Sequence, residues 1–125
     1  MRFGKINRLR LAKDFRLVKA EATKAECSAF VFYLRISDGL AAPRLAVVTS
    51  RKVGCAVERN RARRVMRAIF RKNAPDFARP CDIIIFVRRG WDKFDFRTLD
   101  EKFAKAARWA ISKQSENAAP QPPHA

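Results

Sequence analysis

The segment VERNRARRVMRAIFRK, residues 57–72, carries the clearest structural signal in this 125-residue chain. Residues 56–72 contain no glycine or proline and are rich in alanine and arginine, so they predict a helix that stops at Asn73-Ala74-Pro75. At about 100° per residue, one helix face carries Ala62, Val65, Met66 and Ile69. The opposite face carries Asn60, Arg64, Arg67 and Arg71, with Arg59 and Arg63 on one flank and Arg61 on the other. The helix is therefore expected to pack its apolar stripe on a core and to present arginines outward.

Three apolar runs around this helix are typical of β-strands. RLAVVT at 44–49 precedes the helix and DIIIFV at 82–87 follows it. The run AFVFYLRI at 29–36 ends at the turn signal Ser37-Asp38-Gly39, and we expect it to pair with 44–49 as an antiparallel ribbon. A short extra strand near residues 24–27 is a further candidate.

The two ends of the chain complete the predicted fold. Phe15, Val18 and Ala22 follow Asp14 at helical spacing, which predicts a short first helix. A last amphipathic helix is expected from Phe96 or Thr98 to Lys113, and residues 114–125, QSENAAPQPPHA, are predicted to be a disordered tail. The prediction is an α+β fold with a single domain at 1–113, in the order α-β-β-(β)-α-β-α. A small mixed sheet would then have the arginine-rich helix in its crossover.

The charge of the chain is strongly positive and unevenly distributed. Lysine and arginine number 28 against 12 acidic residues, a net charge of +16. Residues 1–19 contribute +6 and residues 51–72 contribute +8, whereas residues 20–50 are neutral. Such segregation indicates a polyanionic partner, either nucleic acid or an anionic membrane surface. The helix has no tryptophan and only Phe70 as a large aromatic, which favours nucleic acid.

Several other functional classes have little support in the sequence. Cys27, Cys55 and Cys81 are widely spaced and form no metal-ligand motif, and the only histidine is His124 in the tail. We therefore expect no catalytic group, no metal site and no bound cofactor on the protein. Apolar runs such as residues 27–34 fall far short of the roughly 20 residues needed to span a membrane. Charges interrupt the basic N-terminus where a signal peptide needs an apolar stretch, so a cytoplasmic protein without a membrane partner is predicted.

Arginine suits RNA because its planar guanidinium matches two phosphate oxygens and also stacks on bases. Asn60 would add hydrogen bonds to a base edge, a 2′-hydroxyl or a phosphate. Two alternatives share these features: a structural RNA-binding protein such as a ribosomal protein, and a DNA-binding protein that places the arginine-rich helix in a major groove.

The stretch SRKVGCAVERNRARRVMR at 50–67 resembles the signature of the ribonuclease P protein family. That signature is a strand ending in Ser-Lys-Lys, a Val/Ile-Gly pair, Ala-Val, one residue and Arg-Asn-Arg. Residues 9–15, 29–33 and 82–86 resemble further parts of the family pattern, so the similarity spans about residues 5–111. Cys55 replaces a frequent asparagine, Arg51 the first lysine, and Lys19 a frequent aromatic residue.

The resemblance implies a protein subunit that helps a catalytic RNA to remove the 5′ leader of precursor tRNA. The RNA and its Mg²⁺ would perform the hydrolysis, so the implied partners are the catalytic RNA and precursor tRNA. The residues expected to face RNA are Arg51, Lys52, Arg59, Asn60, Arg61, Arg63, Arg64, Arg67 and Arg71. Phe15 and Tyr33 match aromatic positions of a cleft for the single-stranded leader, where bases would stack on them.

Overall fold

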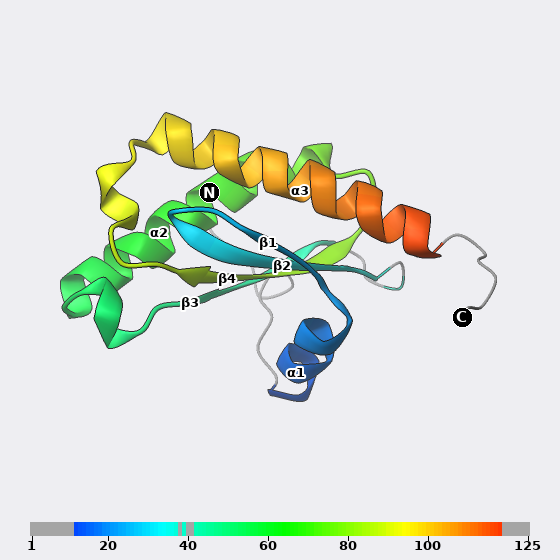
Figure 1. Cartoon of the computed structure of the whole chain (residues 1–125), viewed down its shortest axis with the longest axis horizontal. Coiled ribbons are helices and arrows are strands. Elements are labelled where there is room, and N and C mark those ends of the chain that lie inside the picture. The colour runs from blue at the N-terminus through cyan, green and yellow to red at the C-terminus, as the bar shows by residue number, and fades with distance from the viewer. Residues whose placement is uncertain (1–11, 38, 40–41, 119–125) are drawn as a thin grey trace.

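In the computed structural model, which describes residues 12–37, 39 and 42–118, the chain forms three α-helices and four strands (Figure 1). In chain order these are α1 (Ala12–Glu21), β1 (Thr23–Glu26), β2 (Phe30–Ile36), β3 (Arg44–Val48), α2 (Ala56–Asn73), β4 (Cys81–Val87) and α3 (Phe96–Ala118). The predicted α+β class and element order are confirmed, and the candidate extra strand near residues 24–27 is present as β1.

The strands form one mixed sheet in the order β1-β2-β4-β3. β4 pairs antiparallel with β2 and parallel with β3, so the predicted ribbon between β2 and β3 is wrong. The reason lies in β4, whose residues are almost all buried, whereas β3 is mostly half-buried. A strand that is apolar on both faces is stabilised at the centre of a sheet with helices on both sides. As predicted, the arginine-rich helix α2 lies in the crossover between the parallel strands β3 and β4.

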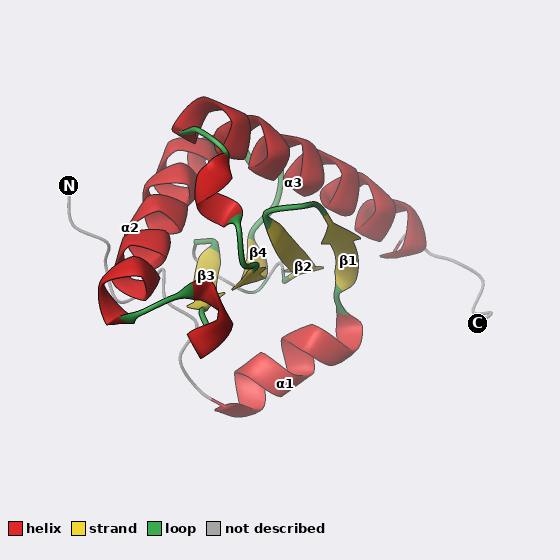
Figure 2. Cartoon of the chain, turned by 60° about the vertical axis from the view of Figure 1, so that its left-hand side comes forward, coloured by secondary structure: helices red, strands yellow, loops and turns green. Residues whose placement is uncertain are grey.

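Helices cover both faces of the sheet (Figure 2). α2 and α3 lie on one side, where they enclose the main core with side chains such as Phe32, Leu34, Met66, Ile83 and Phe103. α1 lies on the other side, where Val18 packs on Ile84 in a smaller cluster. The sheet therefore has one fully covered face and one face on which half-buried side chains remain near α1.

Helix α3 is longer than the sequence suggested. It begins at Phe96, within the expected range, but it continues to Ala118 instead of ending at Lys113. Residues 114–118 are therefore not part of a tail, and residues 119–125 lie outside the described residues. The added length has a tertiary cause, since Gln114 hydrogen-bonds to two other parts of the fold. Across the described ranges, no helix combines the length and apolar character that a membrane crossing requires.

Candidate nucleic-acid interface

A tight turn at residues 50–54 sets the start of α2. Ser50 Oγ accepts a hydrogen bond from the Lys52 backbone N–H at 3.3 Å, and Arg51–Val53 then form a single 3-10 turn. Gly54 has φ +147°, and a Cβ built there would lie 2.0 Å from a carboxylate oxygen of Glu58. The positive φ favours glycine, and a Cβ here would also push the Glu58 carboxylate aside, which explains the glycine of the Val-Gly pair in the sequence motif.

Glu58, the only acid between residues 51 and 72, closes the first turn of α2. Its Oε1 accepts a hydrogen bond from the backbone N–H of Cys55 at 3.1 Å. A carboxylate here satisfies an N–H that has no partner within the helix, and it complements the positive end of the helix dipole. The helix begins at Ala56 as predicted, although Cys55 is a less usual residue than asparagine to precede a helix.

The apolar face of α2 packs as predicted. Ala62, Met66 and Ile69 are buried in the main core, and Val65 is half-buried against it. Phe70 is also buried there, which the face assignment from the sequence had omitted. The core contacts fix the rotation of the helix about its axis and thereby decide which basic side chains reach solvent.

The nine predicted RNA-facing side chains all come from residues 51–71, and we call them the basic ridge. Six of them are exposed: Arg51, Lys52, Asn60, Arg61, Arg64 and Arg71. Three are half-buried: Arg59, Arg63 and Arg67. The ridge residues extend from the turn before α2 to the last turn of that helix (Figure 1), so they share one structural element and the turn that precedes it.

Two of the half-buried arginines are held by neighbouring groups. Arg59 Nη1 donates to the carbonyl oxygen of Gly54 at 2.9 Å. Arg63 donates to Thr49 Oγ1 and to the side-chain oxygen of Asn60. These bonds restrict the long side chains before any ligand arrives, which lowers the entropic cost of ordering them on binding.

Arg61 has an aromatic partner that sequence reasoning missed. Its guanidinium carbon lies 5.5 Å from the ring centroid of Trp91, a distance suited to a cation–π contact. Trp91 is 4% exposed and opens a short 3-10 turn after Gly90, whose φ is +88°. The sequence marks Gly90 as a break in the chain but carries no signal that the following indole would meet α2.

The sheet face toward α1 carries an aromatic pair. Tyr33 on β2 and Phe86 on β4 meet edge to face, with ring centroids 5.6 Å apart, and both are half-buried. The ammonium of Lys19 lies 5.6 Å from the Tyr33 centroid and 5.1 Å from that of Phe86, and Lys24 lies 6.0 Å from Tyr33. Phe15 belongs to α1, but its side chain lies outside the described residues. The structure thus surrounds Tyr33 with one further aromatic ring and two lysines.

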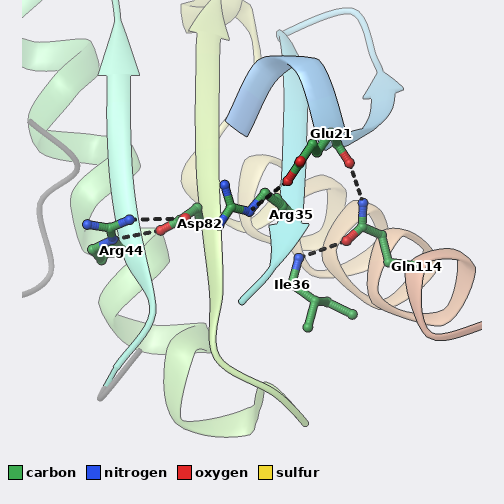
Figure 3. Close-up of polar contacts among 6 residues, drawn as sticks. All are labelled: Glu21, Arg35, Ile36, Arg44, Asp82 and Gln114. Carbon is green, nitrogen blue, oxygen red and sulfur yellow. Dashed lines mark hydrogen bonds and ion pairs between the residues drawn. The ribbon is translucent and has the colours of Figure 1, made fainter. Parts of the chain in front are cut away.

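Next to this pair, the same sheet face carries a row of charged residues (Figure 3). Asp82 is fully buried and accepts two hydrogen bonds from Arg44, at 2.7 Å to Nε and 3.1 Å to Nη2. Arg35 stands opposite Asp82 on the neighbouring strand, and its Nε lies 3.6 Å from Glu21 Oε1 of α1. The bidentate pair compensates the burial of the Asp82 charge, and the Arg35 pair ties α1 to the sheet.

Gln114 joins α3 to the end of α1 (Figure 3). Its side-chain oxygen accepts from the Ile36 backbone N–H at 2.8 Å, and its Nε2 donates to the Glu21 carbonyl oxygen at 2.9 Å. One amide therefore satisfies a backbone donor at the end of β2 and a backbone acceptor at the end of α1. The position of α1 over the sheet thus depends on a residue that the sequence had assigned to the tail.

Titratable groups elsewhere serve the fold. Burial, followed by the nearby Asp82 charge, raises the pKa of the Cys81 thiol to about 12, so this thiol stays protonated at neutral pH. Side-chain hydrogen bonds from Lys72 and then Asn73 lower the pKa of Asp100, which links α2 to α3.

Among the described residues, no three histidine, cysteine or acidic side chains gather closely enough to hold a metal ion.

Comparison with known proteins identifies the family to which this chain belongs. The family profile described as Ribonuclease P matches residues 3–110. The ribonuclease P protein component of Thermotoga maritima is 36% identical over 104 residues, which cover 80% of this chain and 88% of that protein. The component of Pseudomonas aeruginosa is 34% identical, over 82% of this chain and 76% of its own. The chain belongs to the ribonuclease P protein family.

Structural similarity agrees with that assignment. The solved ribonuclease P protein of Thermotoga maritima superimposes with a TM-score of 0.70 at 33% identity, covering 81% of this chain and 94% of that one. The match extends over the mixed sheet and its three helices, as expected from the sequence resemblance. A ribonuclease P protein acts with an RNA subunit in a complex for tRNA processing. RNA is a polyanion, so its charge is opposite to that of the basic ridge.

The predicted residues of this ribonuclease P protein fall into two groups in space. The basic ridge lies on α2 and on the turn that precedes it, and α2 packs on β3. Tyr33 lies on the sheet face toward α1. Reasoning from the sequence missed Trp91, Phe86 and Lys24 as neighbours of these groups. Strand alternation alone would have placed Phe86 on the face of Ile84, but only the sheet register puts it beside Tyr33. The individual roles of these residues in RNA binding stay predictions.

Proposed function

We propose that this protein binds both the catalytic RNA of ribonuclease P and the single-stranded 5′ leader of precursor tRNA, and so assists removal of the leader. The proposal rests on one combined observation: the chain belongs to this family, and it has two separate surfaces suited to RNA. One is the basic ridge on α2, and the other is the lysine-flanked aromatic pair on the sheet.

The basic ridge supports contact with the structured catalytic RNA. Guanidinium groups at neighbouring helix positions match successive phosphates, and bidentate geometry adds specificity to the charge attraction. Arg61, held near Trp91 at 5.5 Å, keeps a defined direction while its edge stays exposed. Asn60 accepts from Arg63 through its oxygen, so its amide nitrogen is oriented to donate to RNA.

The sheet face near α1 supports contact with the leader. A single strand of any sequence is held when its bases stack on aromatic rings and its phosphates meet nearby cations. Tyr33 and Phe86 supply the rings. Lys19 supplies a cation within 5.6 Å of both ring centroids. Lys24 lies 6.0 Å from Tyr33 but is ion-paired with Glu26, so it adds less charge. Lys19 stands where the family often has an aromatic residue. This protein therefore has one ring fewer for base stacking at this position and one more cation for a phosphate.

Hydrolysis itself is assigned to the RNA and to Mg²⁺ bound on the RNA. The protein contributes affinity and position, and it neutralises phosphates that would otherwise repel one another as the substrate docks. The refolded protein alone is therefore expected to leave precursor tRNA uncut, and it should increase cleavage by the cognate RNA most strongly at low Mg²⁺. Metal-dependent cleavage by RNA-free protein would contradict this assignment.

The leader contact is tested with Tyr33→Ala in the assembled complex. Stacking of one base contributes about 1–3 kcal/mol, so binding of precursor tRNA should weaken by that amount while binding of mature tRNA stays unchanged. Phe96→Ala removes an exposed aromatic side chain at the start of α3, away from this sheet face, and serves as the control. Equal losses for precursor and mature tRNA would show that Tyr33 acts through the fold and not through the leader.

A further inference from the structure

A groove lies between the edge strand β1 and helix α3. The sheet order puts β1 and β3 at opposite edges of the sheet (Figure 1). Because α2 packs on β3, the groove lies at the other edge from α2. The groove has a volume of about 300 Å³, and its apolar lining includes Ala25, Phe30, Ala106 and Trp109. This volume suits one small planar group. The groove belongs neither to the basic ridge nor to the sheet face near α1.

Trp109 gives the groove an accessible aromatic surface. Its side chain is 46% exposed, although Phe30 beside it in the groove is only 1% exposed. A large indole left half in solvent on a rigid helix has a free face on which another flat ring can stack. The exposed part of the Trp109 ring does not contribute to the core, so it is available to contact a ligand.

Lysines accompany this indole on the same stripe of α3. Lys102, Lys105, Ala106 and Trp109 are spaced at i, i+3, i+4 and i+7, and all four line the groove. Lys105 is exposed, and no partner for its ammonium occurs within residues 12–37, 39 and 42–118. The Lys102 ammonium lies 5.0 Å from the Phe94 ring centroid, which keeps it beside the helix.

The one acid in the groove does not oppose an anionic ligand. Glu26 lies 3.4 Å from the ammonium of Lys24 and 2.6 Å from Arg88 Nη2, so two cations neutralise its carboxylate. The remaining charge of the groove is positive. A second copy of a chain with net charge +16 would meet electrostatic repulsion here, whereas a polyanion would be attracted.

We infer that the groove between β1 and α3 binds an unpaired nucleotide of RNA, with its base stacked on Trp109 and its phosphate beside Lys105 and Lys102. This inference rests on the proposed function only in taking RNA as the partner. The nucleotide comes either from the catalytic RNA or from the tRNA precursor, because both offer the same chemistry. A site at this edge would extend the RNA contact around the molecule from the basic ridge.

The test uses Trp109→Ala, Trp109→Phe and Lys105→Ala in the full chain. One arm measures the affinity of the protein for the catalytic RNA, and the other measures the affinity of the assembled complex for precursor tRNA. Trp109→Ala should weaken binding about 5- to 150-fold in one arm, and Trp109→Phe should keep most of the affinity. Lys105→Ala should reduce the salt slope by about one. Arg108→Ala is the charge-matched control, since Arg108 is exposed on α3 but lines a different pocket.

A photo-cross-link adds a readout that a purely structural role would not produce. RNA carrying 4-thiouridine should cross-link to Trp109 in the arm that loses affinity. Unchanged affinity in both arms with no cross-link would overturn the inference, as would losses from Arg108→Ala equal to those from Lys105→Ala. Quenching of Trp109 fluorescence by an acidic peptide, with RNA binding unaffected, would also overturn it. If the basic-ridge and Tyr33 variants still weaken binding, then only this inference fails and the proposed function stands.

Discussion

Removing two exposed arginines from the basic ridge should weaken RNA binding without weakening the fold. Arg64 and Arg71 are both exposed on α2, away from Ala62, Met66 and Ile69, which pack in the core. Surface changes of this kind usually alter the free energy of unfolding by less than about 0.5 kcal/mol. The double variant Arg64→Ala, Arg71→Ala should therefore unfold at nearly the temperature of the unmodified protein.

The expected loss of affinity follows from the number of exposed cations. The ridge has five: Arg51, Lys52, Arg61, Arg64 and Arg71. If each meets one phosphate of a duplex, the slope of log affinity against log salt is about −4.5, and the double variant should give about −2.7. At roughly 0.15 M salt, each lost contact costs about 5-fold in affinity by the same relation, so two cost about 30-fold.

The assay is a salt series of binding to the catalytic RNA, run beside thermal unfolding. The matched control is Arg97→Ala, Arg108→Ala, which removes two exposed arginines from α3 and lowers the net charge equally. The control should keep the slope of the unmodified protein. Identical slopes for both double variants would mean that net charge alone drives binding, and the ridge would have no special role. A large drop in unfolding temperature would instead show that the helix faces are assigned wrongly.

Three further outcomes concern the fold around the two RNA surfaces. Arg44→Ala leaves the buried Asp82 carboxylate without its bidentate partner, so urea unfolding should show a loss of about 3 kcal/mol; a loss below about 1 kcal/mol would contradict the buried pair. Gly54→Ala puts a Cβ on a residue at φ +147° and displaces the Glu58 carboxylate from the Cys55 N–H, so stability should fall by about 1–3 kcal/mol; wild-type stability would refute the strained turn. Asp100 has a lowered pKa, so its contribution to stability is present above the unfolded value of 3.8 and is lost as pH falls through the lower folded value. Asp100→Asn should flatten the decline of unfolding temperature below about pH 4, and an unchanged acid profile would exclude this group as a cause.

The basic ridge also raises the question of how a helix with so many like charges folds. Arginines four residues apart, such as Arg63 and Arg67, repel by roughly 0.2–0.5 kcal/mol per pair. Glu58 at the helix start and the hydrogen bonds from Arg59 and Arg63 to groups before and within α2 offset part of this cost. Burial of Met66, Ile69 and Phe70 supplies the larger stabilisation, at about 1.5–3 kcal/mol for each side chain. Packing on the core therefore keeps the cations together until RNA neutralises them.

Local patterns in the sequence determined most of the secondary structure, except for the end of α3, and the identity of the basic surface. The spacing of Ala62, Met66 and Ile69 specifies one apolar face, and this alone requires Arg64 and Arg71 to point outward. The Val-Gly pair, Glu58 and the break at Pro75 bound the helix through interactions within a few residues. Such features are readable because each depends on neighbours along the chain.

Only the tertiary structure decided how distant segments meet. The sheet order put β4 between β2 and β3, since an almost wholly buried strand gains most from the central position. The same packing brought Trp91 to Arg61, Phe86 to Tyr33 and Gln114 to the end of α1. These partners lie far apart in the chain, so no periodicity links them. Their contacts exist because the sheet register and the docking of α3 satisfy many burial and hydrogen-bond requirements at once.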